Sequence, residues 1–264
     1  MKKSFVIACV CSLLLVSSAY AGVLRVGATP TPHAEVLAQV KDALAAEGVE
    51  LKVVEFTDYV TPNLALSDGE LDANYFQHLP YLVSFRNDRG LKLVSVATIH
   101  VEPMGLFSKN VKALSDLKDG ASIAIPNDPT NSGRALLLLQ SAGLIKLDPK
   151  SGLTATELDV EDNPHGFKFR SLEAAQLPRA LDDVDAAVIN GNYALPAGFN
   201  PAKDALLVEG AQSPYANIIA VKAGNEKNED IAKLVKALQS EQISAFILNT
   251  YSGGVLPAFG GPEQ

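Results

Sequence analysis

The chain has no tryptophan and only two cysteines, Cys9 and Cys11, which both lie near its N-terminus. The rest of the sequence therefore has no thiol for a disulfide, a metal thiolate site or nucleophilic catalysis. Positive charge is also scarce, because 22 lysine and arginine residues stand against 30 aspartate and glutamate residues. Since no basic run is present, we expect neither nucleic acid nor an anionic membrane surface as a partner.

Short catalytic and cofactor motifs are missing as well. The sequence has no H-E-x-x-H, no G-x-S-x-G and no G-x-G-x-x-G after its first predicted strand. Its four histidines, His33, His78, His100 and His165, lack the spacing of a metal site. We therefore expect no metal, no cofactor and no enzymatic activity, and the pattern favours a binding module.

Residues 1–21 are typical of a secretory signal peptide. Two lysines precede an apolar stretch at 5–16, and an A-x-A sequence ends at Ala21. We expect cleavage after Ala21 and a periplasmic or otherwise extracytoplasmic location for residues 22–264. A lipid anchor at Cys9 is the alternative, but only about four apolar residues precede Cys9, fewer than the roughly 7 to 15 of a signal's apolar region.

Strands and helices alternate along the remaining sequence. Strands are predicted at 24–28 and 51–56, and apolar residues at helical spacing predict a helix at 31–47 between them. A second unit begins with a strand at 122–126, and the last long helix is predicted at 228–249. This rhythm predicts an α/β fold with mostly parallel sheets covered by helices.

The length of the exported part suits two lobes, each with a mostly parallel sheet flanked by helices. We place the first lobe at residues 22–105 plus 223–264 and the second lobe at residues 106–222. No change in composition marks these borders.

The segment N-D-P-T-N-S-G-R at 127–134 follows a predicted strand and begins a predicted helix. A helix N-terminus attracts anions, and Arg134 adds a planar fork that suits a carboxylate. The alternative is that Asp128 or Asn131 simply caps the helix while Arg134 forms a surface ion pair. A P-loop is excluded, because its lysine and its glycine spacing are absent.

Aromatic residues gather in A-N-Y-F-Q-H-L-P-Y at 73–81. Tyr75, Phe76 and Tyr81 could line an apolar pocket, and His78 could form a hydrogen bond with a ligand. The alternative is ordinary core packing, with His78 as a turn residue. Residue types alone leave both interpretations open.

Two asparagines lie beside predicted strands. Asn190 follows a strand at 186–189, and ligands of open α/β sheets lie beyond the carboxyl ends of strands. Asn217 precedes a strand at 218–222, so the pattern supports it less. Asparagine is also a routine turn residue, and a purely structural role stays open for both.

Five longer segments stand in order along the chain: V-G-A-T-P-T-P-H-A-E, A-N-Y-F-Q-H-L-P-Y-L, E-P-M-G-L-F-S, I-P-N-D-P-T-N-S-G-R-A-L-L-L-L-Q and S-P-Y-A-N. Together they resemble the NlpA-type methionine-binding proteins of ABC transporters, over essentially all of residues 22–264. The resemblance implies a two-lobed periplasmic binding protein fold of the type II kind. The ligand then lies in a cleft between lobes that close by a hinge.

The resemblance also implies a set of site residues. It assigns Arg134 to the ligand carboxylate, and Asn190 and Asn217 to the ligand's amino and carboxylate groups. The residues that it places around the sulfur-containing side chain are Tyr59, Phe76, His78 and Tyr81.

The implied function is binding of L-methionine, D-methionine or a methionine-containing dipeptide by a monomer. The protein would deliver this ligand to a membrane permease driven by a cytoplasmic ATPase. An exported enzyme on the same two-lobed scaffold is the alternative, since fold alone does not determine function. An extracellular adhesin or sensor domain is a third interpretation.

Overall fold

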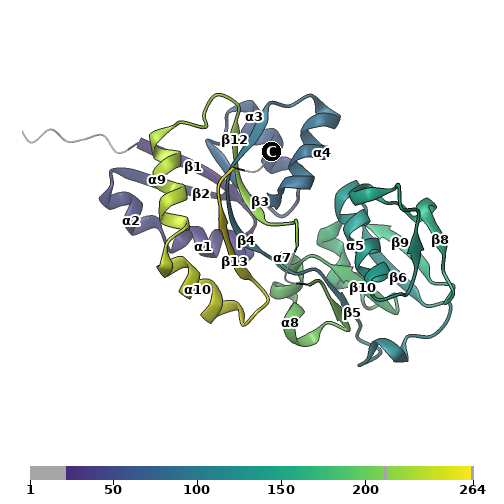
Figure 1. Cartoon of the computed structure of the whole chain (residues 1–264). Coiled ribbons are helices and arrows are strands. Elements are labelled where there is room, and N and C mark those ends of the chain that lie inside the picture. Colours follow the sequence, from purple (N-terminus) through teal and green to yellow (C-terminus); the bar gives the residue numbers. More distant parts are fainter. Residues whose placement is uncertain (1–21, 211–212, 263–264) are drawn as a thin grey trace, which may run out of the picture.

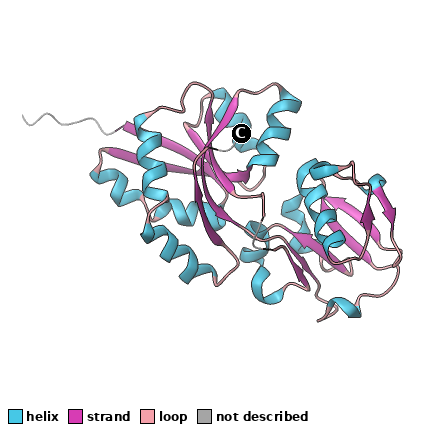
Figure 2. Cartoon of the chain, in the orientation of Figure 1, coloured by secondary structure: helices cyan, strands magenta, loops and turns pink. Residues whose placement is uncertain are grey.

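The computed structural model describes residues 22–210 and 213–262, which form two lobes side by side (Figure 1). Each lobe is a β-sheet with helices packed on its faces (Figure 2). The predicted signal peptide, its cleavage at Ala21 and the alternative anchor at Cys9 lie outside the described residues. Within the described ranges, none of the helices combines the length and the apolar character needed to cross a bilayer.

The first lobe contains a six-stranded sheet with the order β13-β4-β12-β3-β1-β2. Its strands are β1 (Gly22–Ala28), β2 (Val49–Glu55), β3 (Ala73–His78), β4 (Leu93–Val101), β12 (Asn217–Lys222) and β13 (Leu256–Gly260). Its helices are a π-helical turn (Pro30–Ala34), α1 (Glu35–Ala38), α2 (Lys41–Ala46), α3 (Thr61–Asp68), α4 (Leu79–Arg89), α9 (Glu229–Leu238) and α10 (Glu241–Tyr251).

The second lobe contains a five-stranded sheet with the order β11-β5-β10-β6-β9 and a small hairpin. Its strands are β5 (Gly105–Phe107), β6 (Ser122–Pro126), β9 (Lys168–Leu172), β10 (Ala186–Ile189) and β11 (Leu207–Val208), and the hairpin pairs β7 (Lys146–Leu147) with β8 (Val160–Asp162). Its α-helices are α5 (Pro129–Ser141), α6 (Leu177–Ala180), α7 (Gly191–Ala194) and α8 (Pro201–Asp204). Short 3₁₀ turns lie at Leu114–Asp116, Gly152–Thr154, Glu157–Asp159, Ala174–Gln176 and Leu195–Ala197.

Both sheets are mixed, and the prediction of mostly parallel sheets is wrong, because antiparallel pairs are at least as frequent as parallel pairs in each. In the first lobe β1 pairs in parallel with β2 and β3, whereas β12 lies antiparallel between β3 and β4. The predicted border at 222/223 is therefore wrong, because residues 217–222 form the β12 strand of the first sheet rather than part of the second lobe. The chain crosses between the lobes twice, and we call residues 102–104 the outgoing crossover and residues 209–210 with 213–216 the return crossover.

Two predicted long helices are broken. The helix predicted at 31–47 cannot begin at Thr31, because the residue before a proline avoids helical backbone angles, and Thr31 has a ψ of 133°. It instead forms a π-helical turn, α1 and α2. The helix predicted at 228–249 divides into α9 and α10, because the Ser240 side chain accepts a hydrogen bond from the Ile243 amide and caps a new helix.

Each lobe has its own apolar core. In the first lobe, α1, α2, α9 and α10 bury one face of the sheet around residues such as Val26, Leu37 and Leu234, which are all fully buried. In the second lobe, α5 covers Ile123 and Val188. Most residues of each core come from one lobe, which is the organisation that generally permits domains of one chain to move relative to each other.

The strands of both sheets deliver polar side chains to the space between the lobes. Strand β3 ends at His78, and Asn190 follows the end of β10. Since β12 runs antiparallel to β3, its first residue, Asn217, pairs directly with His78. The edge of the first sheet that holds the carboxyl ends of β3 and β4 thus also holds the start of β12, which explains how a residue that precedes a strand reaches the cleft.

The close packing of α5 provides a test of the second lobe. A Cβ atom at Gly133 would lie 2.3 Å from the Leu153 carbonyl oxygen and 2.8 Å from the Ala155 amide nitrogen. We expect Gly133→Ala to lower the free energy of unfolding by roughly 1–3 kcal/mol, although alanine is the better helix former by about 1 kcal/mol. Urea denaturation measures this change.

Ser141→Ala at the exposed end of the same helix is the matched control. We expect it to change the free energy of unfolding by no more than about 0.5 kcal/mol. A Gly133→Ala protein as stable as the wild type would contradict the contact between α5 and residues 153–155.

Candidate functional site

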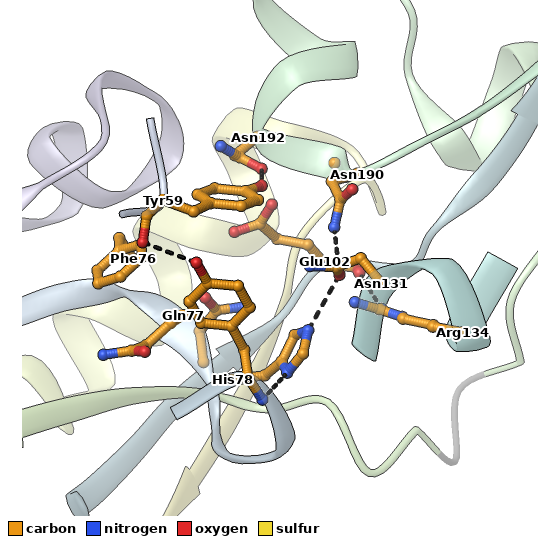
Figure 3. Close-up of a pocket in the computed structure, with 12 residues that line it drawn as sticks. Tyr59, Phe76, Gln77, His78, Glu102, Asn131, Arg134, Asn190 and Asn192 are labelled. Carbon is orange, nitrogen blue, oxygen red and sulfur yellow. Dashed lines mark hydrogen bonds between the residues drawn. The ribbon is translucent and has the colours of Figure 1, made fainter. Parts of the chain in front are cut away.

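A cavity lies between the two lobes, and side chains from both lobes and from the outgoing crossover line it (Figure 3). All seven site residues predicted from the sequence contribute to its wall. From the first lobe these are Tyr59, Phe76, His78, Tyr81 and Asn217, and from the second lobe Arg134 and Asn190. The other lining residues are Gln77, Glu102, Asn131, Gly191 and Asn192.

Three aromatic rings form one wall of the cavity. The ring centroids of Tyr59, Phe76 and Tyr81 lie 5.8–6.1 Å apart, in tilted and edge-to-face arrangements. The Tyr81 hydroxyl donates to the Tyr59 carbonyl oxygen at 2.9 Å, and the Tyr59 hydroxyl donates across the cleft to Asn192 Oδ1 at 2.5 Å. Burial raises the pKa of both phenols, so this wall is uncharged.

His78 is fixed in one tautomer by its place at the start of α4. Its Nδ1 accepts a hydrogen bond from the Tyr81 amide at 3.1 Å, so its Nε2 carries the proton and donates to Asn131 Oδ1 at 3.1 Å. Burial and the charge of Arg134 lower the pKa of His78 to about 3. Both ring nitrogens are already bonded, and His78 therefore packs and orients neighbouring groups.

In the first turn of α5 the predicted helix cap is present, but the predicted surface ion pair of Arg134 is not. The Asp128 side chain caps the helix by accepting from the Asn131 amide at 2.9 Å, as the capping alternative holds. Asn131 Oδ1 then accepts from Asn190 Nδ2 at 2.8 Å as well as from His78. Arg134, however, lies in no surface ion pair, because its side chain is only 4% exposed.

The Arg134 guanidinium is held from two sides. Its Nε donates to Glu209 Oε1 at 3.0 Å, its Nη2 donates to Glu209 Oε2 at 2.5 Å, and Nη2 also donates to the Glu102 carbonyl oxygen at 2.9 Å. The Tyr215 ring covers one face, with its centroid 4.2 Å from Cζ. The planar fork that was expected to meet a ligand carboxylate thus meets a carboxylate of the same chain.

Several buried polar atoms of the site have no hydrogen-bond partner within residues 22–210 and 213–262. They are Asn190 Oδ1, Asn192 Nδ2 and the Tyr215 hydroxyl. Buried polar groups are nearly always paired in folded proteins, so unpaired ones that gather at one cavity call for an external partner. The set includes both a hydrogen-bond acceptor and a donor.

Glu102 is the centre of a buried network behind the cavity. Its Oε1 lies 2.8 Å from His100 Nε2 and 3.3 Å from His33 Nε2. The Thr29 and Tyr75 hydroxyls meet the Nδ1 atoms of His33 and His100, respectively. Burial lowers the pKa of His33 to about 4 and that of His100 to about 3, and it raises the pKa of Glu102.

Ligand atoms of His33, His100 and Glu102 lie within 4.8 Å of one another, a separation that a metal ion could bridge. Hydrogen bonds already account for the same nitrogen atoms, because each Nδ1 meets a hydroxyl, His100 Nε2 meets Glu102 Oε1, and His33 Nε2 meets Asn217 Oδ1. The distance between His33 Nε2 and Asn217 Oδ1 is 3.0 Å. The cluster therefore orients Glu102 and Asn217 toward the cavity, and the spacing of histidines in the sequence did not reveal it.

The sequence profile of the NlpA lipoprotein family matches residues 24–259. The chain belongs to this family. It is 48% identical to the D-methionine-binding lipoprotein MetQ of Escherichia coli K12 over 211 residues. This aligned region covers 79% of this chain and 78% of that protein. The resemblance stated from five sequence segments is thereby confirmed.

Solved structures agree with this membership of the NlpA lipoprotein family. A nutrient-binding protein from Burkholderia cenocepacia bound to methionine is 49% identical, with a TM-score of 0.86, over 89% of this chain and 100% of that chain. A putative methionine-binding lipoprotein from Bacillus subtilis is 42% identical, with a TM-score of 0.87, over 90% and 98% of the two chains. The predicted two-lobed α/β fold is confirmed.

Several residues of this NlpA-family site were not predicted, among them Glu102, Asn192 and Glu209. Glu102 opens the E-P-M-G-L-F-S segment, one of the five that carry the family resemblance, and that position was a usable signal. Asn192 lies two residues after the predicted Asn190. Glu209 carries no local signal, because only the folded chain brings it to Arg134, 75 positions away in the sequence.

Proposed function

We propose that this chain is an extracytoplasmic solute-binding protein of an ABC importer, and that it binds methionine, in the L form, between its lobes. The observation that carries the proposal is one cavity that combines an aromatic wall, a buried guanidinium and unpaired asparagine atoms. Methionine needs these three features, because it has an apolar side chain, a carboxylate and an ammonium group. A relative named a D-methionine-binding lipoprotein and a solved relative bound to methionine support methionine as the ligand, whereas the L form is part of the proposal.

The ligand carboxylate is assigned to Arg134 and Asn217. Nη1 of Arg134 makes no hydrogen bond with the described residues, whereas Nε and Nη2 do. Asn217 Oδ1 is turned toward His33 Nε2, which leaves the Asn217 amide nitrogen as a donor. A carboxylate that bonds to these donors in a dry cleft gains about 1.5–3 kcal/mol for each charged hydrogen bond.

The ligand ammonium is assigned to Glu102 and Asn190. Asn190 Oδ1 is a buried acceptor without a partner in the described ranges. Glu102 supplies the negative charge, and its pairing with two neutral histidines leaves that charge uncompensated within the network. An ammonium group would therefore be the counter-ion that the buried carboxylate requires.

The ligand side chain is assigned to the wall of Tyr59, Phe76 and Tyr81. Burial of a methionine side chain contributes roughly 1.5–3 kcal/mol, and contact between sulfur and an aromatic ring adds about 0.3–1.5 kcal/mol. Together with the two charged ends, these terms support an affinity of about 1 μM or better, which corresponds to about −8 kcal/mol. D-methionine and a methionine-containing dipeptide are the alternative ligands.

Delivery to a membrane permease with its ATPase follows from the same proposal, and it requires export. The relatives in the NlpA family are named lipoproteins, which favours a lipid anchor over the free form that the sequence predicted. Mass spectrometry of the N-terminal peptide of the exported protein decides between these forms. A lipidated cysteine would give the anchored form, and an N-terminus at Gly22 would give the free one.

The binding proposal predicts a saturable interaction that depends on Arg134. We expect mass spectrometry of natively purified protein to find methionine, and calorimetry of the unfolded and refolded protein to give a micromolar or tighter Kd. Arg134→Ala should weaken binding by roughly 100-fold, or about 3 kcal/mol, because it removes the carboxylate partner.

Arg179→Ala, at an exposed position of the second lobe, is the control and should bind as the wild type does. Circular dichroism checks that the Arg134 variant is folded. Unchanged affinity in folded Arg134→Ala would contradict the assigned pose. Conversion of the ligand to a product during incubation would instead support the exported enzyme.

The assignment of the ammonium predicts a pH dependence. The raised pKa of Glu102 means that this carboxylate becomes protonated at a higher pH than an ordinary glutamate, while His33 and His100 stay neutral down to about their lowered pKa values of 4 and 3. Affinity should be full above the raised pKa and should fall by up to about tenfold per pH unit as the pH drops through it.

Calorimetry between about pH 8 and pH 5 measures this dependence, in a range where ordinary carboxylates stay ionised. The Glu102→Gln variant should bind more weakly than the wild type at high pH, and its affinity should no longer vary over this range. The same fall in affinity with pH in Glu102→Gln as in the wild type, or equal affinities of the two proteins at high pH, would exclude Glu102 as the ammonium partner.

A further inference from the structure

Glu209 forms an ion pair with Arg134 at the edge of the cavity. Both carboxylate oxygens accept hydrogen bonds from the guanidinium, from Nε and from Nη2. The two side chains are 4% and 15% exposed, so water screens the pair little. The positive charge of Arg134 is therefore already balanced by a carboxylate of this chain.

The backbone holds Glu209 in this position. Its amide donates to the Met104 carbonyl oxygen at 2.9 Å, and the Met104 amide donates to Glu209 Oε2 at 3.4 Å. Glu209 and Met104 thus join the return crossover to the outgoing crossover. A ligand carboxylate that displaced the Glu209 side chain would break its hydrogen bonds with Arg134 and with the Met104 amide, which favours an arrangement in which both carboxylates share one guanidinium.

We propose that Glu209 is an affinity-determining residue, a built-in counter-ion that weakens the hold of Arg134 on the ligand carboxylate. The inference rests on the proposed function, because it takes Arg134 as the partner of that carboxylate. Glu209 orients the guanidinium through Nε and Nη2 and leaves Nη1 for the ligand. Its negative charge also repels the incoming carboxylate, and the repulsion is strong where water is excluded.

The consequence concerns release. A solute-binding protein has to give up its ligand, and a buried arginine with the ligand as its sole counter-ion would hold a carboxylate for longer. With Glu209 in place, opening of the cleft leaves Arg134 paired, so that loss of the ligand exposes no uncompensated buried charge. Glu209 would therefore raise the dissociation rate of ligands with a free carboxylate.

The test compares two ligands in Glu209→Gln. L-methionine carries the carboxylate, and L-methioninamide replaces it with a neutral amide but keeps the ammonium and the side chain. We expect Glu209→Gln to bind L-methionine about tenfold more tightly than the wild type, or about 1.4 kcal/mol, with a slower dissociation rate. Its affinity for L-methioninamide should stay within about twofold of the wild-type value, or about 0.4 kcal/mol.

Two further variants separate charge from position. Glu209→Asp keeps the charge and shortens the side chain, so it should bind L-methionine no more tightly than the wild type. Glu161→Gln removes a carboxylate from a surface ion pair with Lys146 and should leave both affinities unchanged. Thermal unfolding adds an independent measurement, because ligand-free Glu209→Gln should melt below the wild type and saturating L-methionine should narrow the difference.

Weaker or unchanged binding of L-methionine by folded Glu209→Gln would overturn the proposal, and it would leave Glu209 with a positioning role alone. An equal gain for L-methionine and L-methioninamide would also overturn it, since the gain would then not depend on the ligand carboxylate. If the wild-type protein itself bound no methionine, the proposed function would fail first. That outcome is distinguishable because it appears before any variant is measured.

Discussion

Arg134 carries a permanent positive charge into a cleft where its side chain is 4% exposed, and a buried charge without partners costs several kcal/mol. The partners come from the two crossovers: the carbonyl oxygen of Glu102, the carboxylate of Glu209 and the ring of Tyr215. The first turn of α5, which positions Arg134, is itself capped by Asp128. One buried cation thus ties the second lobe to both connections between the lobes.

The same constraint helps to keep His78 neutral. A protonated His78 would place a second positive charge near Arg134, and its lowered pKa reflects both burial and this repulsion. As a neutral ring, His78 can accept through Nδ1 and donate through Nε2, and so it links α4 to α5. His33 and His100 play the corresponding role around Glu102, and they keep a carboxylate beside the cavity without cancelling its charge.

Sequence reasoning reached the architecture and most of the cavity, because both depend on local patterns. Strand ends carry ligand-facing residues in open α/β sheets, and this rule placed Asn190 correctly at the cavity wall. It undervalued Asn217, since strand direction is set by pairing with β3 and β4 and cannot be inferred from the strand's own sequence. The same pairing moved the lobe border, because β12 has no local feature that assigns it to the first sheet.

Charge pairing was the part that sequence could not supply. Arg134 looked equally suited to a ligand carboxylate and to a surface ion pair, and the fold provides a third answer, a buried pair with Glu209. Nothing in the motif around Arg134 points to a residue beyond β11. The bend of the chain through the return crossover brings them together, and such contacts between distant segments exist only in the folded chain.

The placement of the site residues has a consequence for how the proposed ligand would be captured. Glu102 follows β4 and Asn217 begins β12, and these strands are neighbours in the first sheet, so both residues stay with the first lobe when the cleft opens. The aromatic wall belongs to the same lobe, whereas Arg134 and Asn190 move with the second lobe. In the proposed binding mode the first lobe therefore holds the side chain and much of the ammonium site before closure. Closure then adds the guanidinium, and its charge is shared between Glu209 and the ligand.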